Sequence, residues 1–199
     1  LHGRRRGGVD GFWVAGGSGE SVLLDDEENN RIAKIVSDQN QGRIKNIMHV
    51  GATTTIRAVK MAEHAAKAGV GAVCCVPPFF YSPSDDAADV PFFVYNISGV
   101  TGVEITPDLM QKMQDRVSQL SGLKHLAADI SYIRDFAGRG LNCLIGDSYL
   151  MLSALTIGAN GCVDGPLNVA PELWVDIRKA YSDGDLERPQ VPRVRADLQ

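Results

Sequence analysis

The sequence predicts an α/β fold in which parallel strands form a (βα)8 TIM barrel. Short apolar runs alternate with segments of helical periodicity, and each run ends in Gly, Pro, Asn or Ser. The runs are rich in Val, Ile, Phe and Cys, as expected for strands that are buried on both faces. The glycine-rich segment 16–19 after the first run lacks GxGxxG spacing, which disfavours a doubly wound dinucleotide-binding sheet.

Seven strands and six helices are expected, in alternation. The expected strands are Val9–Ala15, Ile44–Val50, Gly71–Pro77, Pro91–Asn96, Gly122–Leu126, Leu141–Gly146 and Gly161–Asp164. The expected helices are Glu27–Asn40, Thr54–Ala68, Thr106–Gln119, Ile130–Gly138, Tyr149–Ile157 and Pro171–Tyr181. No change of composition marks a second domain, so residues 1–199 are expected to form a single barrel domain.

The chain is short for a complete barrel, which usually needs roughly 250 residues. We therefore expect the first strand and the C-terminal helices to be absent, with ragged joins at Leu1–Gly7 and Pro189–Gln199. Between Ser82 and Val90 there is no room for the crossover helix that links parallel strands, so residues are expected to be missing there as well.

Composition excludes several classes of function. A net charge of −4 and the lack of a basic face beyond Arg4–Arg6 argue against a nucleic-acid partner. No apolar stretch approaches the roughly 18 residues of a membrane span, and no signal peptide is evident. The four cysteines lie in apolar runs without metal-ligand spacing, which indicates reduced thiols, a cytoplasmic protein and no metal site.

Lys124 is the candidate nucleophile. Active sites of TIM barrels lie at the carboxyl ends of the strands. Of the seven lysines in the chain, Lys124 is the one expected near such an end. Burial depresses the pKa of an ammonium, which favours the neutral amine that attacks a carbonyl carbon. Spacing alone leaves open the alternative that Lys124 points outward between helices, with its amine in water.

Two further features would complete such a site. Tyr95 ends the neighbouring strand in the same layer and could pass protons, or could instead only cap the core. The turn Gly16–Gly19 could present successive backbone N–H groups to a substrate carboxylate, although most glycine-rich turns are only turns.

The order of motifs resembles the dihydrodipicolinate synthase / N-acetylneuraminate lyase family. The matching segments are Gly11–Val14 followed by Gly16–Glu20, His49–Gly51, Val76–Tyr81, Val94–Ile97, Gly122–Lys124, Gly158–Gly161 and Asn168-Val169. Members of this family are homotetrameric class I aldolases or synthases that bind pyruvate as a Schiff base without a cofactor. The resemblance implies Lys124 as the imine-forming lysine, Tyr95 as the relay tyrosine, and the backbone of Gly17 and Ser18 as the carboxylate cradle. We also expect Val163 to bind substrate.

Several positions depart from the family pattern. Gly17 replaces a hydroxyl residue of the turn, and Phe80 replaces a second relay tyrosine that Tyr81 could supply. Val100 stands where synthases place an arginine, and Leu126 replaces a hydroxyl residue. Ser98 stands where proline is usual, and Asp164 where a small residue is common.

These departures keep several functions open. The sequence predicts a pyruvate-dependent aldolase or lyase acting on a 2-keto acid, such as a 2-keto-3-deoxy sugar acid or a sialic-acid-like substrate, in a homotetramer or dimer. The alternatives are a dihydrodipicolinate synthase-like condensing enzyme and a family member that binds 2-keto acids without turnover. A third alternative is a TIM-barrel enzyme with a different reaction, in which Lys124 has only a structural role.

Overall fold

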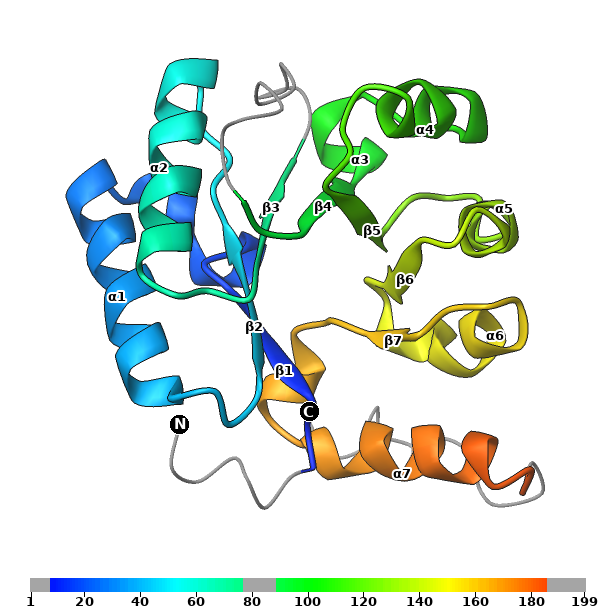
Figure 1. Cartoon of the computed structure of the whole chain (residues 1–199). Helices are drawn as coiled ribbons and strands as arrows, with labels where there is room; N and C mark the ends of the chain where they lie inside the picture. The colour runs from blue at the N-terminus through cyan, green and yellow to red at the C-terminus, as the bar shows by residue number, and fades with distance from the viewer. Residues whose placement is uncertain (1–7, 77–88, 186–199) are drawn as a thin grey trace.

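The computed structural model describes residues 8–76 and 89–185, which form one curved sheet of seven parallel strands (Figure 1). The strands are β1 (Gly11–Val14), β2 (Lys45–His49), β3 (Ala72–Cys75), β4 (Phe92–Asn96), β5 (Leu120–His125), β6 (Asn142–Ile145) and β7 (Gly161–Cys162). Each strand pairs with the next one along the chain, so sheet order follows sequence order. All seven expected strands are confirmed, with ends within two residues of those predicted.

The longer helices lie on the outer side of the curved sheet (Figure 1). They are α1 (Asp26–Asn40), α2 (Thr55–Lys67), α4 (Pro107–Gln114), α5 (Tyr132–Gly138), α6 (Met151–Thr156) and α7 (Pro171–Ser182). A short helix α3 (Ser98–Thr101) and four 3-10 turns, η2 (Gly17–Gly19), η3 (Ser21–Leu23), η4 (Ser148–Leu150) and η5 (Pro166–Asn168), complete the described elements. None of the helices in the described part of the chain is long and apolar enough to cross a membrane.

The six expected helices are confirmed, and the differences lie at their ends. The helix predicted over Thr106–Gln119 ends at Gln114, because the chain turns there to bury Val117 and to begin β5 at Leu120. The short α3 was not predicted, since Ser98 and Gly99 read as turn residues.

The fold is TIM-barrel-like, but the complete eight-stranded barrel is not confirmed. Sequential parallel pairing with helices on the outer side is the arrangement that a (βα)8 barrel uses, and the described residues supply seven of its strands. The expected joins at Leu1–Gly7 and Pro189–Gln199 lie outside the described residues. So does nearly all of the segment between Ser82 and Val90, which belongs to the connection from β3 to β4.

Two apolar cores lie on the two faces of the sheet, because side chains alternate along each strand. The outer core packs strand residues such as Val94 and Leu123 against helix residues such as Phe136, all fully buried. The inner core is smaller and consists of Ala72, Cys74 and Phe93 with Trp13, Ile47 and Leu144. Tyr95 and Lys124 continue the inward-facing positions one step nearer the carboxyl ends of their strands.

Gly122 shows why the approach to Lys124 requires a glycine. A Cβ atom at this position would lie 2.5 Å from the Phe93 ring and 2.3 Å from the Asn142 carbonyl oxygen. Both distances are too short for any side chain, so the ring of Phe93 can lie over β5 only where residue 122 is glycine. The Gly122–Lys124 motif is therefore in part a packing requirement of the inner core.

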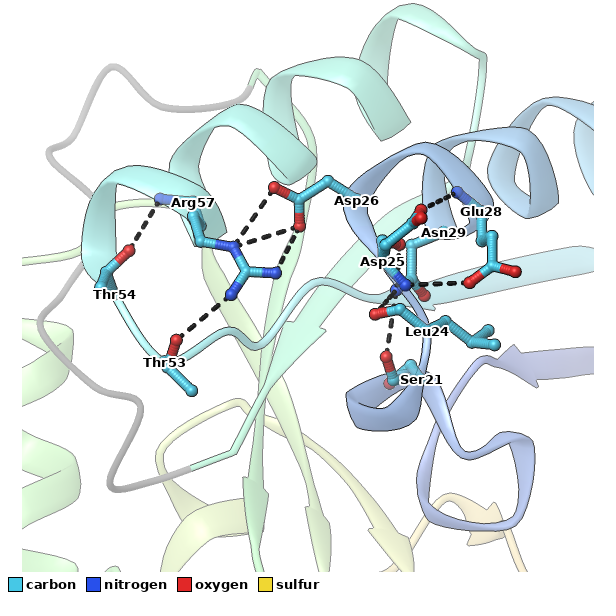
Figure 2. A network of polar contacts seen from close by, with 9 residues as sticks. All are labelled: Ser21, Leu24, Asp25, Asp26, Glu28, Asn29, Thr53, Thr54 and Arg57. Atoms are coloured by element: carbon cyan, nitrogen blue, oxygen red, sulfur yellow. Dashed lines mark hydrogen bonds and ion pairs between the residues drawn. The ribbon is translucent and has the colours of Figure 1, made fainter.

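Hydrogen bonds fix the start of α1 against the turn η3 (Figure 2). Asp25 and Glu28 form a capping box, in which each side chain accepts a hydrogen bond from the other residue's backbone N–H. The buried Asn29 side chain donates to the carbonyl groups of Ser21 and Asp25, which ties η3 to the helix. An exposed ion pair between Asp26 and Arg57 joins α1 to α2.

Candidate active site

Lys124 and Tyr95 lie side by side at the carboxyl ends of β5 and β4. They are paired in the register of the two strands, and the Lys124 Nζ atom lies 4.4 Å from the centroid of the Tyr95 ring. Both are buried, and only 8% of the Lys124 surface is exposed. Nζ also lies 5.7 Å from the ring centroid of Trp13 on β1, so the amine points to the inner face of the sheet. The alternative that Lys124 points outward between helices is therefore wrong.

The electrostatic environment favours a neutral amine beside a protonated phenol. Burial lowers the pKa of Lys124, and the nearby Asp164 carboxylate opposes part of that effect. Burial, with a smaller contribution from Asp164, raises the pKa of Tyr95 to about 12. Cys74 and Cys162 are thiols at neutral pH because burial raises the pKa of each, so Asp164 is the charge that acts on the amine. This combination suits amine attack on a carbonyl group assisted by proton transfer.

Asp164 is held rigidly just beyond β7. One carboxylate oxygen accepts the backbone N–H of Ser148 at 2.8 Å, and the other accepts that of Gly165 at 2.7 Å. The next residue toward the strand, Val163, donates its backbone N–H to the Ile145 carbonyl at 2.9 Å and is half-buried. Val163 thus lies at the same end of the sheet as Lys124, and a fixed negative charge lies next to it.

The glycine turn follows β1 at the same end of the sheet. Ala15 and Glu20, on either side of the turn, have positive backbone φ angles of 53° and 52°, which residues other than glycine rarely adopt. Such conformations cost about 1–3 kcal/mol each and are common at functional sites. Gly17 and Ser18 are exposed, and their N–H groups make no hydrogen bond to any described residue. The turn therefore leaves two successive backbone donors available to an anion.

The missing hydroxyl at Gly17 leaves open space. A Cβ atom built on Gly17 would meet nothing within 4 Å. Ser18, by contrast, has its Oγ atom 3.9 Å from the Cβ position of Gly165, next to Asp164. The turn and the end of β7 are thus neighbours.

His49 is a buried, neutral imidazole on the inner side of β2. Its Nδ1 atom lies 3.0 Å from the Ser21 hydroxyl, and burial lowers its pKa to about 4. A Cβ atom on Gly51 would lie 2.8 Å from two atoms of the imidazole ring, so the ring occupies the space that a side chain there would need. The His49–Gly51 motif is explained by this packing.

Gly146 at the end of β6 makes room for the catalytic candidate. A Cβ atom there would lie 3.1 Å from the Lys124 Cε atom and 2.8 Å from the Leu126 Cβ atom. A larger residue at position 146 would therefore crowd the lysine side chain.

Of the remaining positions that depart from the family pattern, the structure describes only some. Phe80 and Tyr81 lie outside the described residues, so the second relay tyrosine is not described. Val100 lies on α3 with 79% of its surface exposed. No group of three or more His, Cys, Asp or Glu side chains within residues 8–76 and 89–185 could hold a metal ion.

Trp13 is the site residue that sequence reasoning missed. Its ring faces Lys124 and meets the Tyr95 ring edge-on, with centroids 6.0 Å apart. The residue is part of the first motif, but an aromatic residue in a strand reads as core. The alternation of β1, with the turn at its carboxyl end, is the signal that places Trp13 on the inner face.

Known proteins resemble this chain over nearly its whole length. The family model described as the dihydrodipicolinate synthetase family matches residues 5–196. An uncharacterized DapA-like lyase of Halobacterium salinarum is 34% identical over 96% of this chain and 68% of its own length. The 4-hydroxy-tetrahydrodipicolinate synthase of Maridesulfovibrio salexigens is 27% identical over 92% of this chain and 68% of its own.

Solved structures show the same fold. YagE, an Escherichia coli K12 prophage protein of the dihydrodipicolinic acid synthase family solved with pyruvate, superposes with a TM-score of 0.86 at 25% identity. The match covers 94% of this chain and 68% of YagE. A catalytic lysine mutant of the Ruminococcus gnavus sialic acid aldolase has a TM-score of 0.84 at 25% identity, covering 92% of this chain and 64% of its own. The chain belongs to the dihydrodipicolinate synthetase family.

Proposed function

We propose that this protein is a pyruvate-dependent Schiff-base aldolase or lyase that acts on a 2-keto acid. The observation that carries the proposal is the buried Lys124 amine, with a lowered pKa, next to the phenol of Tyr95 at the carboxyl ends of adjacent strands. Relatives in the family support it, since they include a protein solved with pyruvate and an aldolase with a catalytic lysine.

The proposed mechanism begins with attack of the neutral Lys124 amine on the keto carbon. Tyr95 protonates the carbonyl oxygen, and loss of water gives the imine, which is protonated as an iminium. The Tyr95 phenolate then takes the proton of the C4 hydroxyl group, and the iminium withdraws electrons as the C3–C4 bond breaks, which releases an aldehyde and leaves the enamine of pyruvate. Protonation of the enamine carbon and hydrolysis of the imine then release pyruvate and restore the amine.

The substrate carboxylate would bind at the glycine turn. The unpaired N–H groups of Gly17 and Ser18 support this assignment, and backbone donors of this kind need no side-chain hydroxyl at position 17. We assign Val163 to the wall of the same pocket. The exposed Val100 offers no charge to a second carboxylate, so an aldehyde part with hydroxyl groups fits better than an acidic one. The substrate class we propose is therefore a 2-keto-3-deoxy sugar acid.

A second candidate is binding of 2-keto acids without turnover. It is favoured by Gly17, which removes a hydroxyl from the turn beside the proposed proton relay. The two candidates share imine formation and differ only in C–C cleavage.

The experiment is to trap the imine with borohydride in the presence of pyruvate. We expect one pyruvyl group to be reduced onto the protein, and we expect the modified peptide to contain Lys124 and none of the other six lysines. Borohydride without pyruvate is the control for nonspecific reduction. Absence of label at saturating pyruvate would refute imine formation. Label without cleavage of 2-keto-3-deoxy acids would favour the binding protein.

A further inference from the structure

The two tryptophans of the chain differ in how their indole N–H groups are satisfied. Trp174 donates from Nε1 to the Ser148 carbonyl oxygen at 3.2 Å. Trp13 Nε1 is shielded from solvent and has no hydrogen-bond partner in the described structure. A buried donor without an acceptor destabilises a fold, so such a group in a native protein calls for an explanation.

The unpaired indole N–H lies at the candidate active site. The face of the Trp13 ring lies toward the Lys124 amine, with Nζ 5.7 Å from the ring centroid. Its N–H edge lies against the first residue of the glycine turn, where a Cβ atom on Gly16 would be 3.1 Å from Nε1. Trp13 therefore connects the lysine to the turn.

Two further unpaired donors follow Gly16 along the chain. Beyond Gly16 come the N–H groups of Gly17 and Ser18, which have no acceptor among the described residues. Trp13 Nε1 adds a third unpaired donor, from the residue whose ring faces the Lys124 amine. An anion is the ligand that such a set recognises.

We propose that Trp13 Nε1–H is a third hydrogen-bond donor to the carboxylate of the 2-keto acid, a role that rests on the proposed function. It supplies from β1 a donor that the turn lacks because Gly17 has no hydroxyl. Nε1 is shielded in the unliganded chain, so the carboxylate reaches it through a small shift of the turn.

The first test is the indole ¹⁵N–¹H resonance of Trp13 in the full chain, titrated with pyruvate. The resonance is assigned by its loss in Trp13→Phe, and that of Trp174 serves as the internal reference. We expect pyruvate to shift the Trp13 resonance and to leave Trp174 in place. Methyl pyruvate, which lacks the carboxylate charge, should shift it much less. A Trp13 resonance that does not move at saturating pyruvate would overturn the proposal.

The second test compares Trp13→Phe with the matched control Trp174→Phe by borohydride trapping. Trp13→Phe keeps the aromatic ring and removes the donor, so the pyruvate concentration for half-maximal trapping should rise about tenfold or more, as for loss of a hydrogen bond to a charged group. The trapping rate at saturation should stay near that of the wild type. Trp174→Phe should lower the melting temperature and leave half-saturation unchanged. A wild-type half-saturation in Trp13→Phe would refute the role of the indole.

The Lys124→Ala variant separates this inference from the proposed function. Without an amine it forms no imine, yet the carboxylate donors remain, so pyruvate should still shift the Trp13 resonance. If wild-type protein is not trapped by borohydride but the resonance shifts, the proposed function fails and the indole contact holds. If trapping succeeds and the resonance is unmoved, the reverse is true.

Discussion

Adjacent residues on β4 and β5 form two pairs that differ in how their polar groups are satisfied. Asn96 and His125 face outward and are fully hydrogen-bonded. Asn96 bonds both the N–H and the carbonyl of Ile105, its Nδ2 lies 3.3 Å from His125 Nδ1, and His125 Nε2 lies 3.0 Å from the Asp129 carbonyl. Tyr95 and Lys124 face inward, and within the described residues neither side chain makes a hydrogen bond.

The comparison separates polar groups that hold the fold from polar groups free to react. The outward pair fits a single arrangement of protons. His125 Nε2–H donates to the backbone carbonyl oxygen of Asp129, and His125 Nδ1 accepts from the Asn96 side chain. The inward pair is buried, and no hydrogen bond from the described residues offsets the cost of its desolvation. We therefore expect substitutions in the outward pair to change stability and substitutions in the inward pair to change chemistry.

The largest expected effect is that of Lys124→Ala. It should abolish formation of the borohydride-trapped adduct, because the other six lysines lie on helices or, for Lys45, at the start of β2. The melting temperature should hold or rise slightly. Stability is retained because the variant removes a buried amine and its desolvation cost. Mass spectrometry and a thermal melt check the two parts. A variant that unfolds, and loses trapping only in proportion, would make Lys124 a structural residue.

Tyr95→Phe should slow imine formation by roughly 10²–10⁴-fold, as expected for loss of a general acid–base group. The ring that faces Lys124 remains, and the lost hydroxyl has no partner among the described residues, so stability should be unchanged. The matched control is Tyr181→Phe, whose hydroxyl donates to the Leu155 carbonyl at 3.0 Å. The control should lose about 1 kcal/mol of stability and no rate. A wild-type trapping rate in Tyr95→Phe would remove this tyrosine from the mechanism.

Asn96→Ala tests the outward pair. The substitution leaves the Ile105 N–H and carbonyl without their side-chain partner, and it should lower the free energy of unfolding by about 1–3 kcal/mol. Denaturant titration measures that loss. Imine formation per folded molecule should stay near that of the wild type. A loss of trapping rate without loss of stability would show that the outward pair positions Lys124.

The fold and the two central residues could be predicted from sequence because they depend on local patterns. Alternating apolar runs located all seven strands, and the ends of the runs located Lys124 and Tyr95. The pairing of these two residues followed from their positions on neighbouring strands.

The other site features depend on contacts across the sheet, which no local pattern encodes. Two such contacts are that between the Trp13 ring on β1 and the Lys124 amine on β5, and that between Ser18 and Gly165. The early end of α4 depends on the burial of Val117 rather than on helical periodicity. Asp164 departs from the family pattern, but its effect on the pKa of Lys124 depends on the distance between two residues on different strands and their loops.

Asp164→Asn should have the smallest effect, and it acts on the inward pair without touching it. Asp164 raises the pKa of Lys124 against the larger effect of burial, so its neutral replacement should lower that pKa further. More of the amine is then neutral at a given pH, and the pH dependence of imine formation should move to lower pH.

The pH–rate profile of trapping with pyruvate measures this shift, with Asp147→Asn as the matched control. Asp147 is a carboxylate at the end of β6 that accepts the Tyr149 N–H at 2.9 Å and, unlike Asp164, is not among the charges that shift the pKa of Lys124. The control profile should coincide with that of the wild type. If both variants move the profile equally, the effect belongs to the general negative field at this end of the sheet. If neither moves it, burial alone sets the pKa of Lys124, and Asp164 is only the hydrogen-bond acceptor that joins Ser148 to Gly165.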